Sequence, residues 1–213
     1  MSSLSSIPWT RRLRGVADIL AGLTVITGFT LLLAGQVGEG SFEPFFHFSY
    51  LTNQTSYSNI VVLLAGGFLA FTKPQDTLAY ATVRAIFVAY AAVVGIVYNA
   101  LLREPDHFGF HNEVTHVAIP IYLVLDWLIR NNRPRIGWNT IWIGLSYPLV
   151  WIGVTLIRGE VTGWYPYFFV NPHDGLGWGG VLAFVLAIAV FFAGFIAGMV
   201  ALNHLQQRRI SKS

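Results

Sequence analysis

Six long apolar segments leave this chain few ways to fold. A helix needs about 20 mostly apolar residues to cross the hydrocarbon core of a bilayer. Six stretches of the 213-residue sequence meet that requirement, roughly 15–35, 46–71, 80–102, 109–129, 138–157 and 177–204. Only 11% of the residues are charged, against roughly 25% in soluble domains. We therefore predict an all-α, polytopic membrane protein, in which residues 1–213 form a single domain of six transmembrane helices.

The basic residues predict the orientation of these segments. With the N-terminus in the cytoplasm, only Arg103 and Arg158 of the 13 Lys and Arg residues lie outside. An excess of positive charge in cytoplasmic loops is the usual determinant of topology. Both termini are then cytoplasmic, and the pI of about 9.3 needs no nucleic-acid partner. The cytoplasmic residues are Arg11, Arg12, Arg14, Lys73, Arg84, Arg130, Arg133, Arg135, Arg208, Arg209 and Lys212.

Two charged residues lie near the cytoplasmic ends of their predicted spans. Asp18 follows three arginines, so we expect a local ion pair or a solvated position. Arg84 lies near the start of the third span, and we expect its side chain to extend to the membrane surface as an anchor. Cysteine is absent, which excludes disulfides, thiol catalysis and thiolate metal sites.

The second apolar segment opens with a stretch of polar residues. Ser49, Thr52, Ser56 and Asn59 are spaced so that a single helix would carry all four on one face. Lipid offers no hydrogen-bond partner, so this stripe should face the protein interior or a wet cavity. Such residues also join membrane helices to each other, so the stripe by itself does not separate packing from chemistry.

The fourth segment carries a candidate partner for this stripe. His116 lies seven residues into a span that begins near residue 109, a depth of about 10 Å. Thr52 lies six residues into its own span, a depth of about 9 Å, and both spans enter from the outer side. A hydroxyl and an imidazole at matched depth suit a nucleophile and its general base. A lone buried histidine is also commonly structural, so spacing leaves both interpretations open.

Three short patches give the chain a resemblance to a known family. They are Tyr50-Leu51-Thr52, Asn112-x-x-x-His116-x-x-x-Pro120 and Val161-Thr-Gly-Trp-Tyr-Pro-Tyr-Phe168. In order and position they resemble the androgen-induced-gene family of six-span membrane proteins, which includes the androgen-dependent TFPI-regulating protein, and more closely its bacterial relatives. The animal members are threonine hydrolases that cleave fatty acid esters of hydroxy fatty acids. The resemblance covers most of the chain and implies that Thr52 and His116 are the essential pair.

Two features depart from the family pattern. His116 precedes Pro120 by four positions, where the animal members have five. Glu113 follows Asn112, where they have a second histidine. Thr115 or His111 could therefore hold a shifted role.

The resemblance implies an intramembrane hydrolase of lipid esters. His116 would take the proton from Thr52, whose oxygen attacks the ester carbonyl, and water would release the acyl group. Candidate oxyanion or substrate-pocket residues are Asn99, Asn112, Glu113, Tyr98 and Tyr165. We expect a membrane lipid or fatty-acid ester as the substrate, no cofactor, no nucleic-acid partner, and a place in the bacterial cell membrane. The oligomeric state stays open.

Two further sequence features bear on the shape of this site. Pro120 removes a backbone donor from the fourth span, and should bend it just below His116. The loop of residues 158–176 is long, aromatic and rich in turn residues, as a lid would be.

Two other classes of function remain possible from the sequence. One is a zinc or iron site formed by histidines and a carboxylate, although no HExxH spacing supports it. Its candidate ligands are His47, His111, His116, His173 and Glu113. The other is a non-enzymatic lipid-binding, transport or scaffold role. No inverted repeat is visible between the halves of the chain, which weakens the transporter version.

Overall fold

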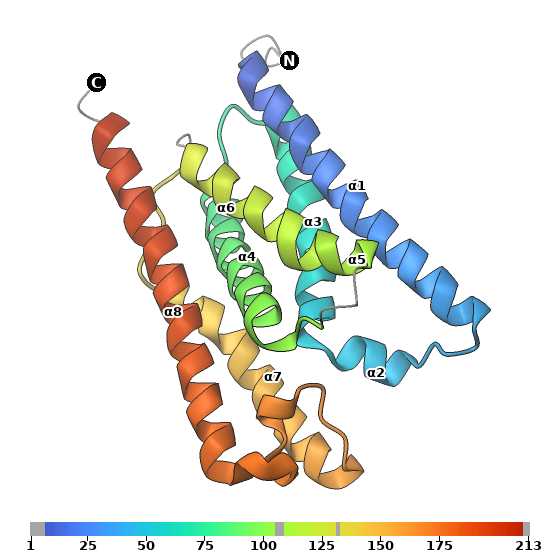
Figure 1. Ribbon diagram of the computed structural model, residues 1–213. Coiled ribbons are helices and arrows are strands. Elements are labelled where there is room, and N and C mark those ends of the chain that lie inside the picture. The colour runs from blue at the N-terminus through green and yellow to red at the C-terminus, as the bar shows by residue number, and fades with distance from the viewer. Residues whose placement is uncertain (1–6, 105–108, 131–132, 211–213) are drawn as a thin grey trace.

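The computed structural model describes residues 7–104, 109–130 and 133–210, which form helices and loops without any strand. Long helices run side by side, and the start of α1 and the end of α8 lie at the same end of the molecule (Figure 1). The long helices are α1 (Trp9–Gly38), α3 (Leu51–Thr72), α4 (Leu78–Val97), α7 (Thr140–Thr162) and α8 (Gly177–Ile210). The shorter ones are α2 (Pro44–Ser49), η2 (Tyr98–Leu102), α5 (Phe110–Glu113), η3 (Val114–Ala118), α6 (Ile119–Ile129), η4 (Phe168–Val170) and η5 (Pro172–Leu176).

Within the described residues, five helices are long and apolar enough to cross a membrane. They are α1, α3, α4 continued through η2, α7, and α8 together with η5. The protein is therefore an all-α, multi-pass membrane protein. The predicted span 109–129 is not among the five, because it consists of α5, η3 and α6 in direct succession, each of them short.

The second predicted span is two helices rather than one. Tyr50 is extended (φ −71°, ψ 126°) and separates α2 from α3. The prediction of one continuous polar stripe is wrong for Ser49, which ends α2, whereas Ser56 and Asn59 are buried on α3 as expected. The break makes Thr52 the second residue of α3, so its hydroxyl lies at a helix N-terminus.

Side chains take over the hydrogen bonds that a continuous helix would have made across Tyr50. Asn53 Nδ2 donates to His47 O at 2.8 Å, Gln54 Nε2 to Phe48 O at 2.6 Å, and Trp151 Nε1 to Ser49 O at 3.1 Å. The last carbonyls of a helix need such external donors, and in lipid they cannot be left unpaired. The tryptophan belongs to α7, so the break depends on a neighbouring helix.

Buried charges join α1, α4 and α6 near the end of the molecule where the termini lie. The Asp18 carboxylate is fully buried and accepts hydrogen bonds from Arg84 (2.8 Å), Arg130 (3.0 Å) and Tyr122 (2.8 Å). Arg84 is 2% exposed and also pairs with Asp126 at 3.0 Å. A solvated Asp18 and a surface-anchoring Arg84 are both wrong predictions, because each side chain finds its partner on another helix.

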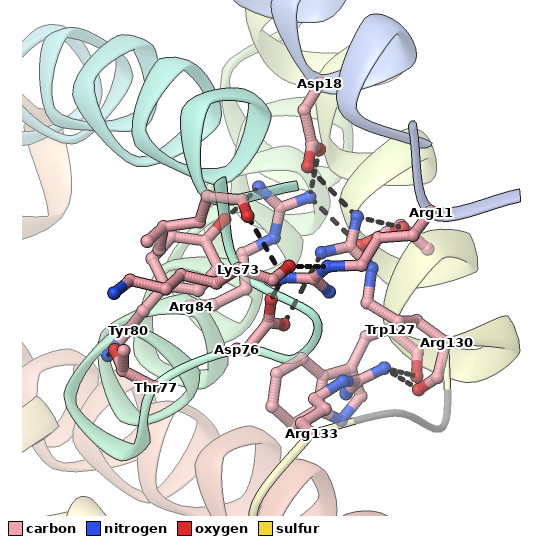
Figure 2. A network of polar contacts seen from close by, with 12 residues as sticks. Arg11, Asp18, Lys73, Asp76, Thr77, Tyr80, Arg84, Trp127, Arg130 and Arg133 are labelled. Atoms are coloured by element: carbon pink, nitrogen blue, oxygen red, sulfur yellow. Dashed lines mark hydrogen bonds and ion pairs between the residues drawn. The ribbon is translucent and has the colours of Figure 1, made fainter. Parts of the chain in front are cut away.

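The same cluster extends to the loop between α3 and α4. Arg11 pairs with Asp76 at 2.8 Å, and Arg130 Nη1 lies 3.6 Å from the same carboxylate. Arg11 Nε also donates to the Lys73 carbonyl at 2.8 Å. Figure 2 shows the side chains from these separate segments converging on one another. Membrane helices have little hydrophobic drive to associate, so these ionic contacts are a specific reason for the helices to meet in this arrangement.

Candidate active site

Thr52 and His116 line one cavity of about 470 Å³. It lies at the start of α3 and at η3, towards the end of the molecule opposite the termini (Figure 1). We call it the polar cavity. Its lining residues are Leu32, Gln36, Ser41, Glu43, Phe46, His47, Tyr50, Thr52, Asn53, Tyr98, Leu102, His111, Asn112, His116, Pro166 and Tyr167.

The surroundings of His116 determine which ring nitrogen carries the proton. Its ring stacks on Tyr98 with centroids 3.8 Å apart. Nδ1 lies 3.1 Å from the Asn112 carbonyl and 3.0 Å from the Thr115 hydroxyl, which itself donates to the His111 carbonyl. A carbonyl only accepts, so Nδ1 carries the proton and the neutral ring keeps a lone pair on Nε2. Nε2 forms no hydrogen bond within the part of the chain that the structure describes, and it is available as a base.

The helix around His116 is irregular because of Pro120. Residues Val114–Ala118 form a π-helical turn immediately before α6. Pro120 has no N–H to offer the carbonyl of His116 four residues earlier. Asn99 supplies the missing donor, since its Nδ2 lies 3.1 Å from that carbonyl. Asn99 thus contacts the His116 backbone, and it is not among the residues lining the polar cavity.

Thr52 is held by a tyrosine of the loop between α7 and α8. The Thr52 N–H donates to the Tyr167 hydroxyl at 3.3 Å, and that hydroxyl donates to Thr52 Oγ1 at 3.4 Å. Tyr167 is only 9% exposed. Burial raises the pKa of Tyr167 to about 12, so it stays a hydrogen-bond donor at neutral pH. The loop predicted as a lid therefore does lie against Thr52.

Sequence reasoning selected the neighbouring tyrosine instead. The hydroxyl of Tyr165 donates to Glu160 at 2.6 Å, and Tyr165 is not among the residues lining the polar cavity. Both tyrosines flank Pro166, and no feature of the sequence distinguishes the one that turns inward.

The other predicted pocket residues are divided between the cavity and its surroundings. Asn112 and Tyr98 line the polar cavity. Glu113 forms an ion pair with Arg103 and makes no contact that would orient His116. The Asn112 carbonyl, rather than Glu113, holds Nδ1 of His116.

A second cavity adjoins the first. It has a volume of about 80 Å³, and it shares Thr52, Tyr98, Leu102 and Tyr167 with the polar cavity. We call it the apolar pocket. Its other lining residues are Leu51, Val93, Val94, Val97, Leu145, Pro148, Leu149, Trp151, Ile152, Phe169, Val170, Val185, Ile188, Ala189 and Phe192. Apart from Thr52, the two tyrosine hydroxyls and the indole N–H, the side chains that form it are hydrocarbon.

The histidines that the structure describes are not gathered into a group of metal ligands. Nowhere in residues 7–104, 109–130 and 133–210 do three or more His, Cys, Asp or Glu side chains gather as metal ligands would. His47 Nε2 is 2.8 Å from the Tyr57 hydroxyl, and burial lowers the pKa of His47, so its ring is neutral at pH 7. His173 pairs with Glu160 at 2.8 Å, outside the polar cavity.

Comparison with protein-family models, curated proteins and solved structures finds no significant match to this chain. The case for a function therefore depends on the geometry of the two cavities and on the three sequence patches described above.

Proposed function

We propose that this protein is an intramembrane hydrolase of lipid esters, with Thr52 as the nucleophile and His116 as its general base. The observation that carries the proposal is that both side chains line one cavity, while hydrogen bonds at Nδ1 leave the His116 Nε2 lone pair available. A threonine hydroxyl is a weak nucleophile unless an adjacent base activates it. The resemblance to a family of threonine hydrolases supports the same pair.

The membrane arrangement is part of the proposal. We infer that Phe110–Ile129 crosses the bilayer as a sixth span, because η3 continues the helix between α5 and α6. An even number of spans places both termini on the same side of the membrane, and the distribution of basic residues makes that side the cytoplasmic one. The site then lies in the outer leaflet of what the resemblance suggests is a bacterial cell membrane. Its depth is that of lipid ester groups.

The reaction would proceed through an acyl-threonine. His116 Nε2 accepts the Thr52 proton while Oγ1 bonds to the ester carbonyl carbon. The tetrahedral intermediate collapses as the alcohol leaves, taking that proton from His116. A water molecule in the polar cavity then gives a proton to His116 and attacks the acyl-threonine. Release of the carboxylic acid restores the Thr52 hydroxyl and neutral His116.

The start of α3 and Tyr167 are placed to stabilise the developing oxyanion. The first N–H groups of a helix have no partners within it and carry a partial positive charge, and Thr52 is the second residue of α3. The Tyr167 hydroxyl already lies 3.4 Å from Oγ1. A hydroxyl beside the nucleophile can turn to the carbonyl oxygen of the bound ester, and donors aimed at a developing oxyanion commonly contribute a factor of about 100 to 1,000 in rate.

Labelling and turnover test this assignment. Purified protein in detergent is treated with a fluorophosphonate probe, and separately with a chromogenic long-chain acyl ester. Thr52→Ala should abolish labelling, and both Thr52→Ala and His116→Ala should abolish turnover. Thr72→Ala is the control, because it lies on the same helix, lines neither cavity, and its hydroxyl donates to the Phe68 carbonyl. Undiminished turnover in Thr52→Ala would refute the proposed mechanism.

Thr55→Ala is a poorer control than its neighbouring position suggests. The Thr55 hydroxyl is buried and lies 3.0 Å from the Thr52 carbonyl. Its removal could therefore shift the backbone of the nucleophile.

A further inference from the structure

The two cavities meet at the proposed nucleophile. Thr52, Tyr98, Leu102 and Tyr167 line both of them, so Thr52 stands at their junction. An ester whose carbonyl carbon lies at Thr52 has two substituents, the acyl chain and the alcohol. One substituent must extend into the apolar pocket and the other into the polar cavity. The residues that line each cavity determine which substituent it can bind.

The apolar pocket suits a single hydrocarbon chain. It has a volume of about 80 Å³ and is lined by side chains such as Val93 of α4 and Ile188 and Phe192 of α8. A hydroxyl-rich alcohol would lose its hydrogen bonds to water there without replacing them. The acyl half of the ester therefore belongs in this pocket.

The polar cavity suits a small neutral alcohol with free hydroxyls. It is much larger, at about 470 Å³, and its lining includes the amides of Gln36, Asn53 and Asn112. Amides and neutral imidazoles both donate and accept, and hydroxyls can satisfy either kind of group. A second acyl chain would leave these polar groups unpaired.

The charges of the polar cavity disfavour an anionic alcohol. Among the described residues that line it, none is Lys or Arg and one, Glu43, is acidic. A carboxylate or phosphate on the alcohol would thus meet a like charge and no cation. Arg103 lines a third cavity together with His116, but it pairs with Glu113 and is not among the residues lining the polar cavity.

We propose that the preferred substrate is an ester of one long-chain fatty acid with a small neutral polyol, of the monoacylglycerol type. This inference rests on the proposed hydrolase function and specifies its substrate. The part of the acyl chain next to the ester occupies the apolar pocket, and the polyol occupies the polar cavity and leaves through it. The products are a long-chain fatty acid and the free polyol.

Substrate competition tests the proposal. Initial rates are measured for 1-palmitoylglycerol, for dipalmitoylglycerol, and for a palmitoyl ester whose alcohol carries a carboxylate. We expect kcat/KM for 1-palmitoylglycerol to exceed both others at least about tenfold. Glu43→Lys should shift the ratio about tenfold towards the carboxylate-bearing ester, whereas Glu39→Lys, which lies outside the cavity, should leave the ratio unchanged. Equal or greater turnover of the carboxylate-bearing ester by the unmodified protein would overturn the inference while leaving the hydrolase in place.

A binding measurement separates this inference from the hydrolase proposal. Trp151 lines the apolar pocket, so a glycerol ether with a brominated alkyl chain should quench its fluorescence. The quenching should be lost in Trp151→Phe, and it should be at least about tenfold weaker with a brominated fatty acid, which carries a carboxylate. If no ester is hydrolysed but the ether shows this preference, the hydrolase proposal fails and the assignment of the two cavities holds. If the ether does not quench Trp151, or the fatty acid binds equally well, the assignment itself is wrong.

Discussion

Asp18→Asn is expected to destabilise the protein strongly, although it changes one carboxylate oxygen to an amide. Asp18 is fully buried, and its two oxygens accept from Arg84 at 2.8 Å and Arg130 at 3.0 Å. With Asp76 and Asp126, it balances the charges of Arg11, Arg84 and Arg130. The substitution leaves that group with one uncompensated guanidinium charge, and arginine does not lose its proton in proteins.

The magnitude follows from the ion pairs that are lost. Two unit charges about 4 Å apart attract by about 4 kcal/mol at an effective dielectric constant of about 20. Asp18 makes two such pairs, and relief of its own desolvation offsets part of their loss. Removing one partner of a buried pair typically costs about 3–5 kcal/mol. For a protein of this size, that corresponds to a fall in Tm of about 6–20 °C.

Thermal unfolding in detergent, followed by tryptophan fluorescence, measures this effect. Thr24→Ala is the control on the same helix, because its exposed hydroxyl donates only to the Leu20 carbonyl. It should change the unfolding free energy by less than about 0.5 kcal/mol. Asp18→Asn combined with Arg84→Gln should be less destabilised than the sum of the two single variants. A Tm for Asp18→Asn within about 2 °C of the unmodified protein would show that the cluster is not stabilised by its charges.

Three further predictions follow from the site and the membrane arrangement. Tyr167→Phe should lower kcat for ester hydrolysis by about 100-fold with little change in KM. A rise in KM with kcat unchanged would instead indicate a packing role. Asn99→Leu leaves the His116 carbonyl unpaired and should cost about 1–3 kcal/mol in thermal unfolding; an unchanged Tm would mean that this bond contributes nothing. With an impermeant thiol reagent added to intact cells, a single cysteine in Ser41→Cys should react directly, whereas one in Gln75→Cys should react only after lysis. The reverse pattern would show that the topology is inverted.

Local features of the chain were enough to predict the class of fold. The length of an apolar run is a property of contiguous residues, so α1, α3, α4, α7 and α8 were each anticipated as helices that can cross a membrane. The same holds for the irregular turn before Pro120, since a missing N–H disturbs its own helix wherever that helix packs.

The break at Tyr50 was not predictable in this way. Residues 46–71 are apolar enough to continue as one helix, and nothing within them requires an interruption. The break is stabilised by an indole N–H from Trp151, which lies about a hundred residues further along the chain and donates to the Ser49 carbonyl. Its consequence, a threonine at a helix N-terminus, belongs equally to the tertiary structure.

The sequence by itself determined which segments are apolar enough to cross a membrane, and it singled out Thr52 and His116 as a candidate pair. Tertiary structure alone decided which groups meet. Asp18 and Arg84 are 66 positions apart, and Tyr167, rather than Tyr165, reaches Thr52 across 115 positions. The length of an apolar helix follows from counting contiguous residues, because the rise per residue is fixed. Contact also depends on how each helix is rotated and which neighbour it packs against, and these are set by all the helices together.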